Sequence, residues 1–283
     1  MNDITLVIFT CEGREHLLLK SFASFIKACG SVFARKILAV DGKISQGTID
    51  AISPDEIIQS PTRKGYVPSI IRALKNVDTG YFFWLEDDWE FPHDFTVETL
   101  LSLFNNDKVL QVTLAKENAD ASFNAYTEPD IYINGYGFSA NPSLCRTAIV
   151  RDIFNEAAAH KKDESSKFLS FEYFATIYAN SKGLTSLIKY HDNRAFVNHI
   201  GDLESTAREY HMINSISIPV EQGKSEYISG LNRYKEISFF NKMGLFIKLY
   251  VAAIYLSVKL FFSREAYDFA FRIYIASLKR FKH

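Results

Sequence analysis

The chain has 283 residues, 47% of them apolar and 23% charged, a composition typical of a folded globular protein with one large domain or two small ones. This excludes disordered and fibrous chains. The 33 acidic and 32 basic side chains leave a formal charge of -1, which disfavours a dedicated nucleic-acid binder. Cys11, Cys29 and Cys145 are widely spaced, so neither a disulfide framework nor a zinc site is predicted. No secretory signal follows Met1, and we expect a cytoplasmic protein.

Strands and helices alternate along the first ninety residues. Apolar runs of strand length occupy residues 4–10, 37–40 and 81–85, and helical spacing of apolar residues occupies 15–28 and 67–76. Continuous apolar strands that alternate with helices predict an α/β fold, with a mostly parallel sheet covered by helices on both faces. Further along the chain, residues 146–160 and 171–180 have helical spacing. Residues 118–141 are rich in Asn, Gly, Tyr and Ser and predict loops and short strands around a cleft.

The C-terminal segment differs from the rest in charge. Residues 239–283 hold eight basic and two acidic side chains, a net charge of +6, which leaves -7 for the other 238 residues. Its apolar stretch 249–258 is too short to span a bilayer, so two basic amphipathic helices are the best interpretation. We therefore divide the chain into a domain at 1–235 and a helical tail at 236–283. The tail either lies on an anionic membrane surface through 239–283 or packs on protein, as in a homodimer.

Polar or acidic residues follow each of the first three predicted strands. Thr10 and Glu12 follow the first, Asp41 ends the second, and Glu86–Asp88 follow the third. In parallel sheets ligands bind beyond the carboxyl ends of the strands, so these residues predict a binding site. Because adjacent carboxylates repel each other, Glu86, Asp87 and Asp88 are expected to hold a cation, and oxygen ligands favour Mg²⁺ or Mn²⁺. The alternative is a solvated acidic turn.

Three segments together resemble the GT-A glycosyltransferases, particularly those of family 2. They are AVDGK at residues 39–43, RKGYVPSIIRALKN at 63–76 and WLEDDW at 84–89. The resemblance is clear over residues 4–90 and fades towards 210. It implies the GT-A fold and a nucleotide-sugar donor. By this resemblance Thr10, Glu12 and Asp41 contact the nucleoside, Glu86 and Asp87 contact the ribose or sugar, and Asp88 binds the metal. Glu86 replaces the more usual Asp of the family motif.

Basic side chains near the proposed cleft suit the diphosphate of such a donor. Departure of a nucleoside diphosphate leaves negative charge on phosphate oxygens, which Mn²⁺ or Mg²⁺ neutralises as a Lewis acid. Arg14, Arg63, Lys64 and Arg72 are candidates for phosphate contacts, and Lys64 is the first choice because Gly65 lets the backbone approach. An ordinary solvated basic surface is the alternative for each of them.

Two residues far from the acidic motif are candidates for chemistry. Glu172 resembles the acidic residue that opens a helix beneath the acceptor site in the GT-A family. In that role it would take the proton of the acceptor hydroxyl. Alternatively, Glu172 interacts with the helix dipole, and Asp163 or Glu164 is the base. Several GT-A enzymes complete metal coordination with a downstream histidine, so His199 is the second metal candidate, although a lone histidine is more often structural.

The segment 134–142 predicts contacts with a sugar or an acceptor. Its glycines let backbone approach a ligand, and Tyr136 and Phe138 suit stacking on a pyranose ring, although a loop stabilised by aromatic packing fits equally well. After His199, residues Ser205, Thr206 and Arg208 are candidates to close over the diphosphate.

The function predicted is transfer of a sugar, with inversion implied by the resemblance, from a nucleotide-sugar to a hydroxyl acceptor. The sequence fits best a hexosyltransferase of bacterial lipopolysaccharide or capsule synthesis. We expect it to act on a glycan or lipid-linked glycan at the inner face of the cell membrane. The alternatives are a sugar-phosphate nucleotidyltransferase, for which the turn at residues 11–14 is a poor match, and a non-catalytic scaffold that binds membrane or a partner.

Overall fold

The computed structural model describes residues 4–119, 122–159 and 171–201, together with positions 250 and 254. The chain divides into two units, Met1–Lys224 and Ser225–His283. Tyr250 and Ile254, the described positions of the second unit, are both helical. The predicted boundary at 235/236 and most of the predicted tail lie outside the described residues. Within the described ranges, no helix is both long enough and apolar enough to cross a bilayer.

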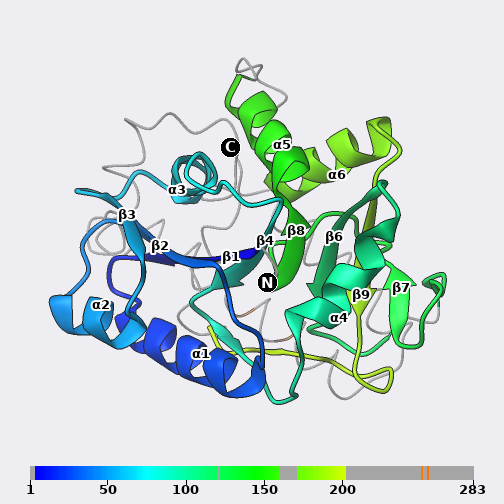
Figure 1. The fold of residues 1–283 in the computed structure, drawn as a ribbon, viewed down its shortest axis with the longest axis horizontal. Coiled ribbons are helices and arrows are strands. Elements are labelled where there is room, and N and C mark those ends of the chain that lie inside the picture. Colours follow the sequence, from blue (N-terminus) through cyan, green and yellow to red (C-terminus); the bar gives the residue numbers. More distant parts are fainter. Residues whose placement is uncertain (1–3, 120–121, 160–170, 202–249, 251–253, 255–283) are drawn as a thin grey trace. The chain divides into compact units, whose positions relative to one another are not determined.

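An eight-stranded mixed sheet in the order β3-β2-β1-β4-β8-β6-β9-β7 forms the centre of the first unit. Its first half is parallel and alternates with helices (Figure 1). The elements of this half are β1 (Ile4–Cys11), α1 (Glu15–Ala28), β2 (Arg35–Asp41), α2 (Gln46–Ile52), β3 (Glu56–Ser60), α3 (Tyr66–Leu74) and β4 (Tyr81–Glu86).

The second half of the sheet is mixed. Strand β8 runs antiparallel to both β4 and β6, β9 is parallel to β6, and β7 is antiparallel to β9. Since β4 and β6 are both antiparallel to β8, they run the same way, and β1, β2, β4, β6 and β9 share one carboxyl edge. The strands and helices of this half are α4 (Val97–Leu101), a 3-10 turn (Ser102–Asn105), β6 (Val109–Leu114), β7 (Ile131–Ile133), β8 (Ser143–Arg146), α5 (Thr147–Ala159), α6 (Phe171–Ser181) and β9 (Thr185–Lys189).

A separate two-stranded sheet joins the acidic motif to a distant segment. Strand β5 (Trp89–Glu90) pairs antiparallel with β10 (Asn198–His199), so that His199 lies opposite Trp89. This pairing connects residues that are more than one hundred positions apart in the sequence. It explains how the histidine reaches the end of β4.

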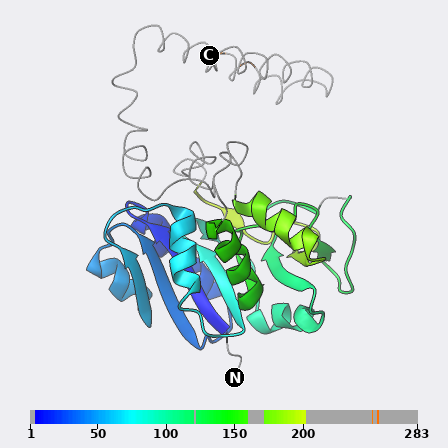
Figure 2. The same ribbon diagram turned by 90° about the horizontal axis from the view of Figure 1, so that it is seen from above.

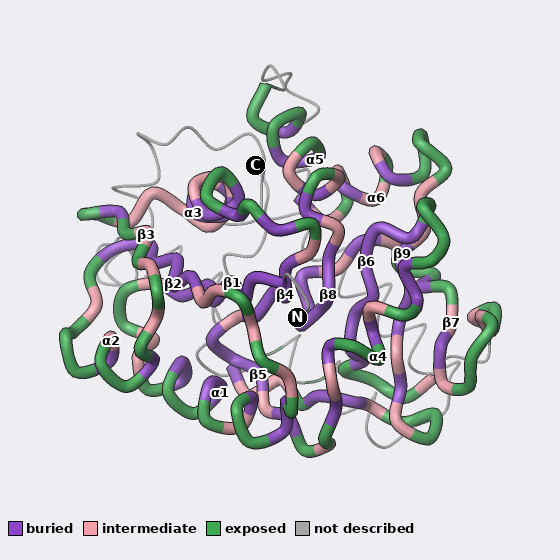
Figure 3. The backbone as a smooth tube through the Cα atoms, viewed as in Figure 1, coloured by how far each residue is buried: buried purple, intermediate pink, exposed green. Residues whose placement is uncertain are grey.

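Alternate side chains of the central strands enter two cores on opposite faces of the sheet. From β1, Leu6 and Ile8 pack with Phe25 of α1, whereas Val7 and Phe9 pack in the core that α3, α5 and α6 cover. Figure 2 shows α3 and α5 on the same side of the sheet, and Figure 3 shows the central strands buried along their length. The predicted fold class, α/β with a mostly parallel sheet and helices on both faces, is confirmed for the first unit.

Candidate functional site

The strand-end residues named from the sequence meet at one edge of the sheet. In the register of the strands Cys11 lies opposite Asp41, and Phe9 lies opposite Glu86. Thr10, at the end of β1, therefore lies beside the carboxylates that follow β4. Thr10, Asp41, Asp87 and Asp88 are all buried, although each carries a polar side chain. Buried polar groups need partners, and the contacts below supply them.

Arg14 connects the two aspartates of the acidic motif. Its Nε donates to Asp87 Oδ1 and Oδ2 at 2.9 and 3.0 Å, and its Nη2 donates to Asp87 Oδ1 at 2.7 Å. The same Nη2 donates to Asp88 Oδ2 at 2.6 Å. Thr10 Oγ1 donates to Asp87 Oδ2 at 2.7 Å. The guanidinium thus makes a forked pair with Asp87 and a bridge to Asp88.

Asp88 is also in contact with the segment that follows β10. His199 Nε2 lies 3.2 Å from Asp88 Oδ2, and the backbone N–H of Ile200 donates to the Asp88 carbonyl at 2.8 Å. Gly201 packs so closely that a Cβ at this position would lie 2.6 Å from Asp88 Oδ2. The glycine is required here because the backbone passes directly over the aspartate.

The three carboxyl groups titrate differently because their surroundings differ. Burial, and then the Asp88 charge, raise the pKa of Glu86 well above its usual range. Burial also acts to raise the pKa of Asp88, but the hydrogen bond from His199 and the charge of Arg14 outweigh it, so this pKa is lowered. As the pH falls, Glu86 is therefore protonated before Asp88, and its protonation reduces the repulsion within the motif.

Asp87 is buried with a guanidinium, and its protonation state follows from the geometry. Burial raises the pKa of Asp87, and Arg14 opposes that effect. Burial acts to lower the pKa of Arg14, but Asp87 more than compensates and the Arg14 pKa is raised. The raised pKa of Asp87 favours a neutral carboxyl group, whereas the raised pKa of Arg14 favours an ion pair. Because the guanidinium and the Thr10 hydroxyl all donate to the Asp87 carboxylate, we assign the ionised pair.

Glu86 faces away from Arg14, towards aromatic residues. The Tyr66 hydroxyl donates to Glu86 Oε1, and Trp89 Nε1 donates to Oε2 at 3.3 Å. The Tyr66 ring in turn packs edge-on against Phe171 of α6, with centroids 5.6 Å apart. Glu86 is therefore connected through Tyr66 to the start of α6, where Glu172 lies.

Asp41 positions the Lys-Gly turn before α3. Its Oδ1 accepts the N–H of Lys64 at 2.7 Å, and its Oδ2 accepts the N–H of Gly65 at 2.8 Å. Gly65 has φ of +103°, a conformation that favours glycine. Arg72 Nη2 lies 3.7 Å from Asp41 Oδ1. Both oxygens of Asp41 thus organise this turn, which presents the half-buried Lys64 at the same edge of the sheet.

Glu12 lies at the margin of this edge. The residue is exposed, and its Oε2 accepts the N–H of Lys43 at 3.0 Å. Cys11, next to it, is an unsuitable nucleophile, because burial and then the Asp87 charge raise the pKa of its thiol to about 12.

The described residues can hold a cation only with help from a ligand. Among them, no group of three or more His, Cys, Asp or Glu side chains could hold a metal ion. Asp88 Oδ1, however, is buried and has no hydrogen-bond partner there, while His199 lies beside the other oxygen. Mg²⁺ is commonly held by one or two carboxylates together with substrate phosphates. Asp88 and His199 fit a cation of this kind.

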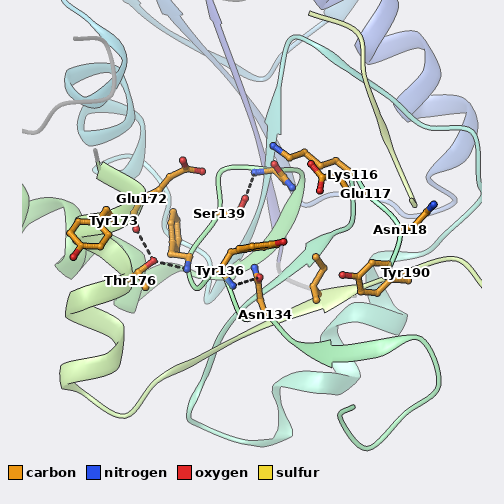
Figure 4. A pocket seen from close by; sticks show the side chains of 13 residues that line it. Lys116, Glu117, Asn118, Asn134, Tyr136, Ser139, Glu172, Tyr173, Thr176 and Tyr190 are labelled. Carbon is orange, nitrogen blue, oxygen red and sulfur yellow. Dashed lines mark hydrogen bonds between the residues drawn. The ribbon is translucent and has the colours of Figure 1, made fainter. Parts of the chain in front are cut away.

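A pocket of about 480 Å³ opens at the same edge, beyond β6 and β9. Figure 4 shows Glu172, Tyr173 and Thr176 of α6 on one side, Lys116, Glu117, Asn118 and Tyr190 on the other, and Asn134, Tyr136 and Ser139 between them. Its lining therefore combines aromatic rings with amide, hydroxyl and charged groups. Such a set suits a polyhydroxylated ligand, whose hydroxyl groups need hydrogen bonds and whose ring faces need apolar contact.

The loop 134–142 is fixed against α6 by polar contacts. Ala140 N–H donates to Glu172 Oε1 at 2.9 Å, and Phe138 N–H donates to Thr176 Oγ1 at 3.0 Å. Gly137 has φ of +81°, and a Cβ there would lie 2.3 Å from Thr176 Cγ2. Phe138 is buried against Trp84, whereas Tyr136 is 67% exposed at the pocket. The sequence thus named both aromatic residues, but of the two only Tyr136 is exposed for stacking on a ligand.

The structure gathers most of the residues named from the sequence into two neighbouring groups. Thr10, Arg14, Asp87, Asp88 and His199 form one network, and Glu172 lines the pocket with Tyr136. Arg63 lies beside this network, where its Nη2 donates to Cys11 Sγ at 3.3 Å. The candidates Asp163, Glu164, Ser205, Thr206 and Arg208 lie outside the described residues.

No site role was predicted from the sequence for Lys116 or Tyr190, which line the pocket, nor for Tyr66 and Gly201 beside the acidic motif. One signal could have found the first of these. The apolar run VLQVTL, which is β6, is followed by the polar stretch Lys116–Asn118, the same strand-end pattern that marked Asp41 and Glu86.

Comparisons with known proteins add one likeness. No protein-family model matches the chain, and no curated protein matches it. Among the solved structures that match, the crystal structure of S. aureus TarS has a TM-score of 0.45 and 15% sequence identity over 86% of this chain. This chain spans 45% of the length of the TarS chain. The fold of the first unit, taken from its strand order and pairing, is α/β with an eight-stranded, mostly parallel mixed sheet.

Proposed function

We propose that the protein is a metal-dependent glycosyltransferase, which moves a sugar from a nucleotide-sugar to a hydroxyl group of an acceptor. One observation carries the proposal: the buried Arg14–Asp87–Asp88–His199 network and the pocket of Glu172 lie at one carboxyl edge of the sheet. Tyr66 lies between neighbours of the two sites, since it contacts Glu86, which precedes Asp87, and Phe171, which precedes Glu172. A transferase that joins two substrates needs two adjoining sites of this kind.

In this proposal the acidic network binds the donor. Asp88 and His199 hold Mn²⁺ or Mg²⁺, which supplies Lewis-acid stabilisation of the departing diphosphate. Thr10, Glu12 and Asp41 lie on the nucleoside side, and Asp87 and Glu86 on the sugar side. Arg14 and Lys64 pair with phosphate oxygens, because guanidinium and ammonium groups stabilise the charge that develops there.

The pocket binds the acceptor, and Glu172 acts as the general base. Its carboxylate takes the proton of the attacking hydroxyl while the new bond to the anomeric carbon forms. The bond between the anomeric carbon and the diphosphate breaks, and its electron pair leaves with the diphosphate oxygen. A single displacement of this kind inverts the anomeric carbon. Ala140 N–H fixes the carboxylate beside the loop of Tyr136, which stacks on the acceptor ring.

We also propose an acceptor class and a location for the protein. An acceptor that is a glycan or lipid-linked glycan of a bacterial surface polysaccharide suits a pocket with aromatic and amide groups. Location at the inner face of the cell membrane is supported by the basic composition of residues 239–283, whose net charge is +6.

A panel of nucleotide-sugars tests the proposal. Each of the UDP-, GDP-, CMP- and dTDP-sugars is added with Mn²⁺ in a thermal-shift assay, since a bound ligand raises the melting temperature by mass action. The donors that bind are then incubated with glycan acceptors, and the products are identified by mass spectrometry. Metal-dependent release of nucleoside diphosphate with a glycosylated product supports the proposal. Consumption of a nucleoside triphosphate with pyrophosphate release would indicate the nucleotidyltransferase instead, and no binding at all would favour the scaffold.

A further inference from the structure

Arg14 shares a carboxylate oxygen with the residue proposed to bind metal. Its Nη2 donates to Asp88 Oδ2 at 2.6 Å, and His199 Nε2 lies 3.2 Å from the same atom. We propose that Arg14 is an internal counter-cation: it occupies the metal position at Asp88 until a donor's diphosphate draws it away, and so couples binding of the divalent cation to binding of the nucleotide. This inference rests on the proposed function, whose metal and donor it concerns.

The positions of the oxygens support competition between Arg14 and a cation. Asp88 Oδ1 has no hydrogen-bond partner among the described residues, so it is available to a metal ion, but Oδ2 is already in contact with both His199 and Arg14. A divalent ion bound by Asp88 and His199 would therefore stand close to a guanidinium that stays protonated. Because like charges repel strongly at a buried site, the two cations exclude each other there.

Both aspartates of the network also have contacts that do not involve Arg14. The Arg14 side chain extends from the turn between β1 and α1, beside Gly13, whose φ of +90° breaks the strand. When the guanidinium moves, Asp87 keeps the hydrogen bond from the Thr10 hydroxyl. A diphosphate offers the guanidinium a pair of anionic oxygens, which replace the carboxylates that it loses. After Arg14 moves from Asp88 to the diphosphate, Arg14 and Asp88 both have a partner of opposite charge only if the metal ion and the diphosphate bind together.

The coupling has a measurable consequence in the absence of turnover. Binding of Mn²⁺ is followed by electron paramagnetic resonance of the free ion, first alone and then with UDP, GDP or CDP present. For the wild-type protein we expect Mn²⁺ to bind weakly alone and about tenfold or more tightly with the nucleotide that fits, a coupling of ordinary size for two linked ligands.

Two substitutions at position 14 distinguish the effect of the guanidinium's contact with Asp88 from the effect of its positive charge. Arg14→Gln removes the competing cation, so Mn²⁺ alone should bind about tenfold more tightly and the effect of nucleotide should fall below about threefold. Arg14→Lys keeps the charge, but an ammonium group cannot make the forked pair with Asp87 and the bridge to Asp88 at the same time. Its Mn²⁺ affinity and its response to nucleotide should be intermediate. Arg35→Gln is the control: Arg35 carries the same charge but pairs with Glu56 at the start of β2, and the Mn²⁺ affinity of this variant should stay within about twofold of wild type.

A second measurement covers the case in which Arg14→Gln is poorly stable. Loss of the guanidinium leaves Asp87 and Asp88 facing each other, so Mn²⁺ alone should raise the melting temperature of Arg14→Gln or Arg14→Lys more than that of wild type. The inference is overturned if Mn²⁺ binds the position-14 variants no more tightly than wild type, or if Arg35→Gln has the same effect. Failure of the proposed function looks different, because wild type would then bind no Mn²⁺ with any nucleotide and form no glycoside.

Discussion

The two halves of the carboxyl edge differ in how their polar groups are satisfied. At the ends of β1, β2 and β4, the carboxylates are buried and already paired with internal donors, as Arg14 pairs with Asp87 and the Lys64 turn pairs with Asp41. Beyond β6 and β9, the polar groups line an open pocket of about 480 Å³. The first half is built to hold charge, and the second is built to admit a ligand. We therefore assign the donor and the metal to the first half and the acceptor to the second.

The largest expected effect is at Asp88. Asp88→Asn keeps the shape of the side chain but removes the charge that holds the cation, which contributes several kcal/mol to the transition state. Sugar transfer should fall about 10⁴-fold, and Mn²⁺ should no longer raise the affinity for nucleotide. Steady-state kinetics and a Mn²⁺ titration measure the two effects. Asp94→Asn, an exposed carboxylate nearby, is the control, and equal losses in both variants would contradict the assignment.

The next largest loss of activity is expected at Glu172, in the pocket half of the carboxyl edge of the sheet. Glu172→Gln keeps an oxygen that can accept the Ala140 N–H, so the loop stays in place while the base is lost. The turnover number should fall about 10³-fold, with the Kd of the nucleotide unchanged. Glu156→Gln, on the exposed face of α5, should leave the turnover number unaltered. A Glu172→Gln protein with normal turnover would remove this residue as the base.

A smaller effect tests the contact between Gly201 and Asp88. Gly201→Ala adds a Cβ that would lie 2.6 Å from Asp88 Oδ2 and 2.7 Å from its Cβ, so the aspartate must shift. We expect Mn²⁺ affinity to fall about tenfold to a hundredfold, and the free energy of unfolding to fall by about 1–3 kcal/mol from overpacking. Gly47→Ala, in α2 with open space around it, should leave Mn²⁺ binding intact and raise stability slightly.

The smallest effect tests the acceptor pocket alone. Tyr136 is 67% exposed, and its ring meets Phe123 edge-on with centroids 5.1 Å apart. Tyr136→Ala should raise the KM of the acceptor about fivefold, the size of one aromatic contact, with no change in the Kd of the nucleotide. Val32→Ala, at a residue that is 80% exposed, provides the baseline for a surface substitution. If the nucleotide Kd changes instead, the donor and acceptor sites have been assigned to the wrong halves.

The sequence predicted the elements whose own pattern determines them. The helix expected over residues 15–28 is α1, because its apolar side chains repeat at helical spacing and four large ones are buried. The strand-end rule found the acidic network at β4. The residue pattern did not predict β8, and Arg146, its last residue, was assigned to the helix that follows. Its four residues SLCR include a serine and an arginine, and it is a strand because it lies between β4 and β6.

The site was predictable in its members but not in their contacts. The residue types of Asp88 and His199 suggested a shared ligand, yet the contact joins positions 111 residues apart and depends on the pairing of β5 with β10. The bridge from Arg14 to both aspartates was also not predicted, since Arg14 was assigned to phosphate. Long-range contacts of this kind follow from how the strands are placed, which local patterns do not specify.

The division of the edge into a donor half and an acceptor half is tested most directly by calorimetric titration of the nucleoside diphosphate in the presence of Mn²⁺. The titration compares wild type, Asp88→Asn and Glu172→Gln. We predict that Asp88→Asn weakens binding of the nucleotide about a hundredfold or more, while Glu172→Gln binds it as wild type does although its turnover number falls about 10³-fold. Equal affinities in Asp88→Asn and wild type, or a matching loss in Glu172→Gln, would contradict the account.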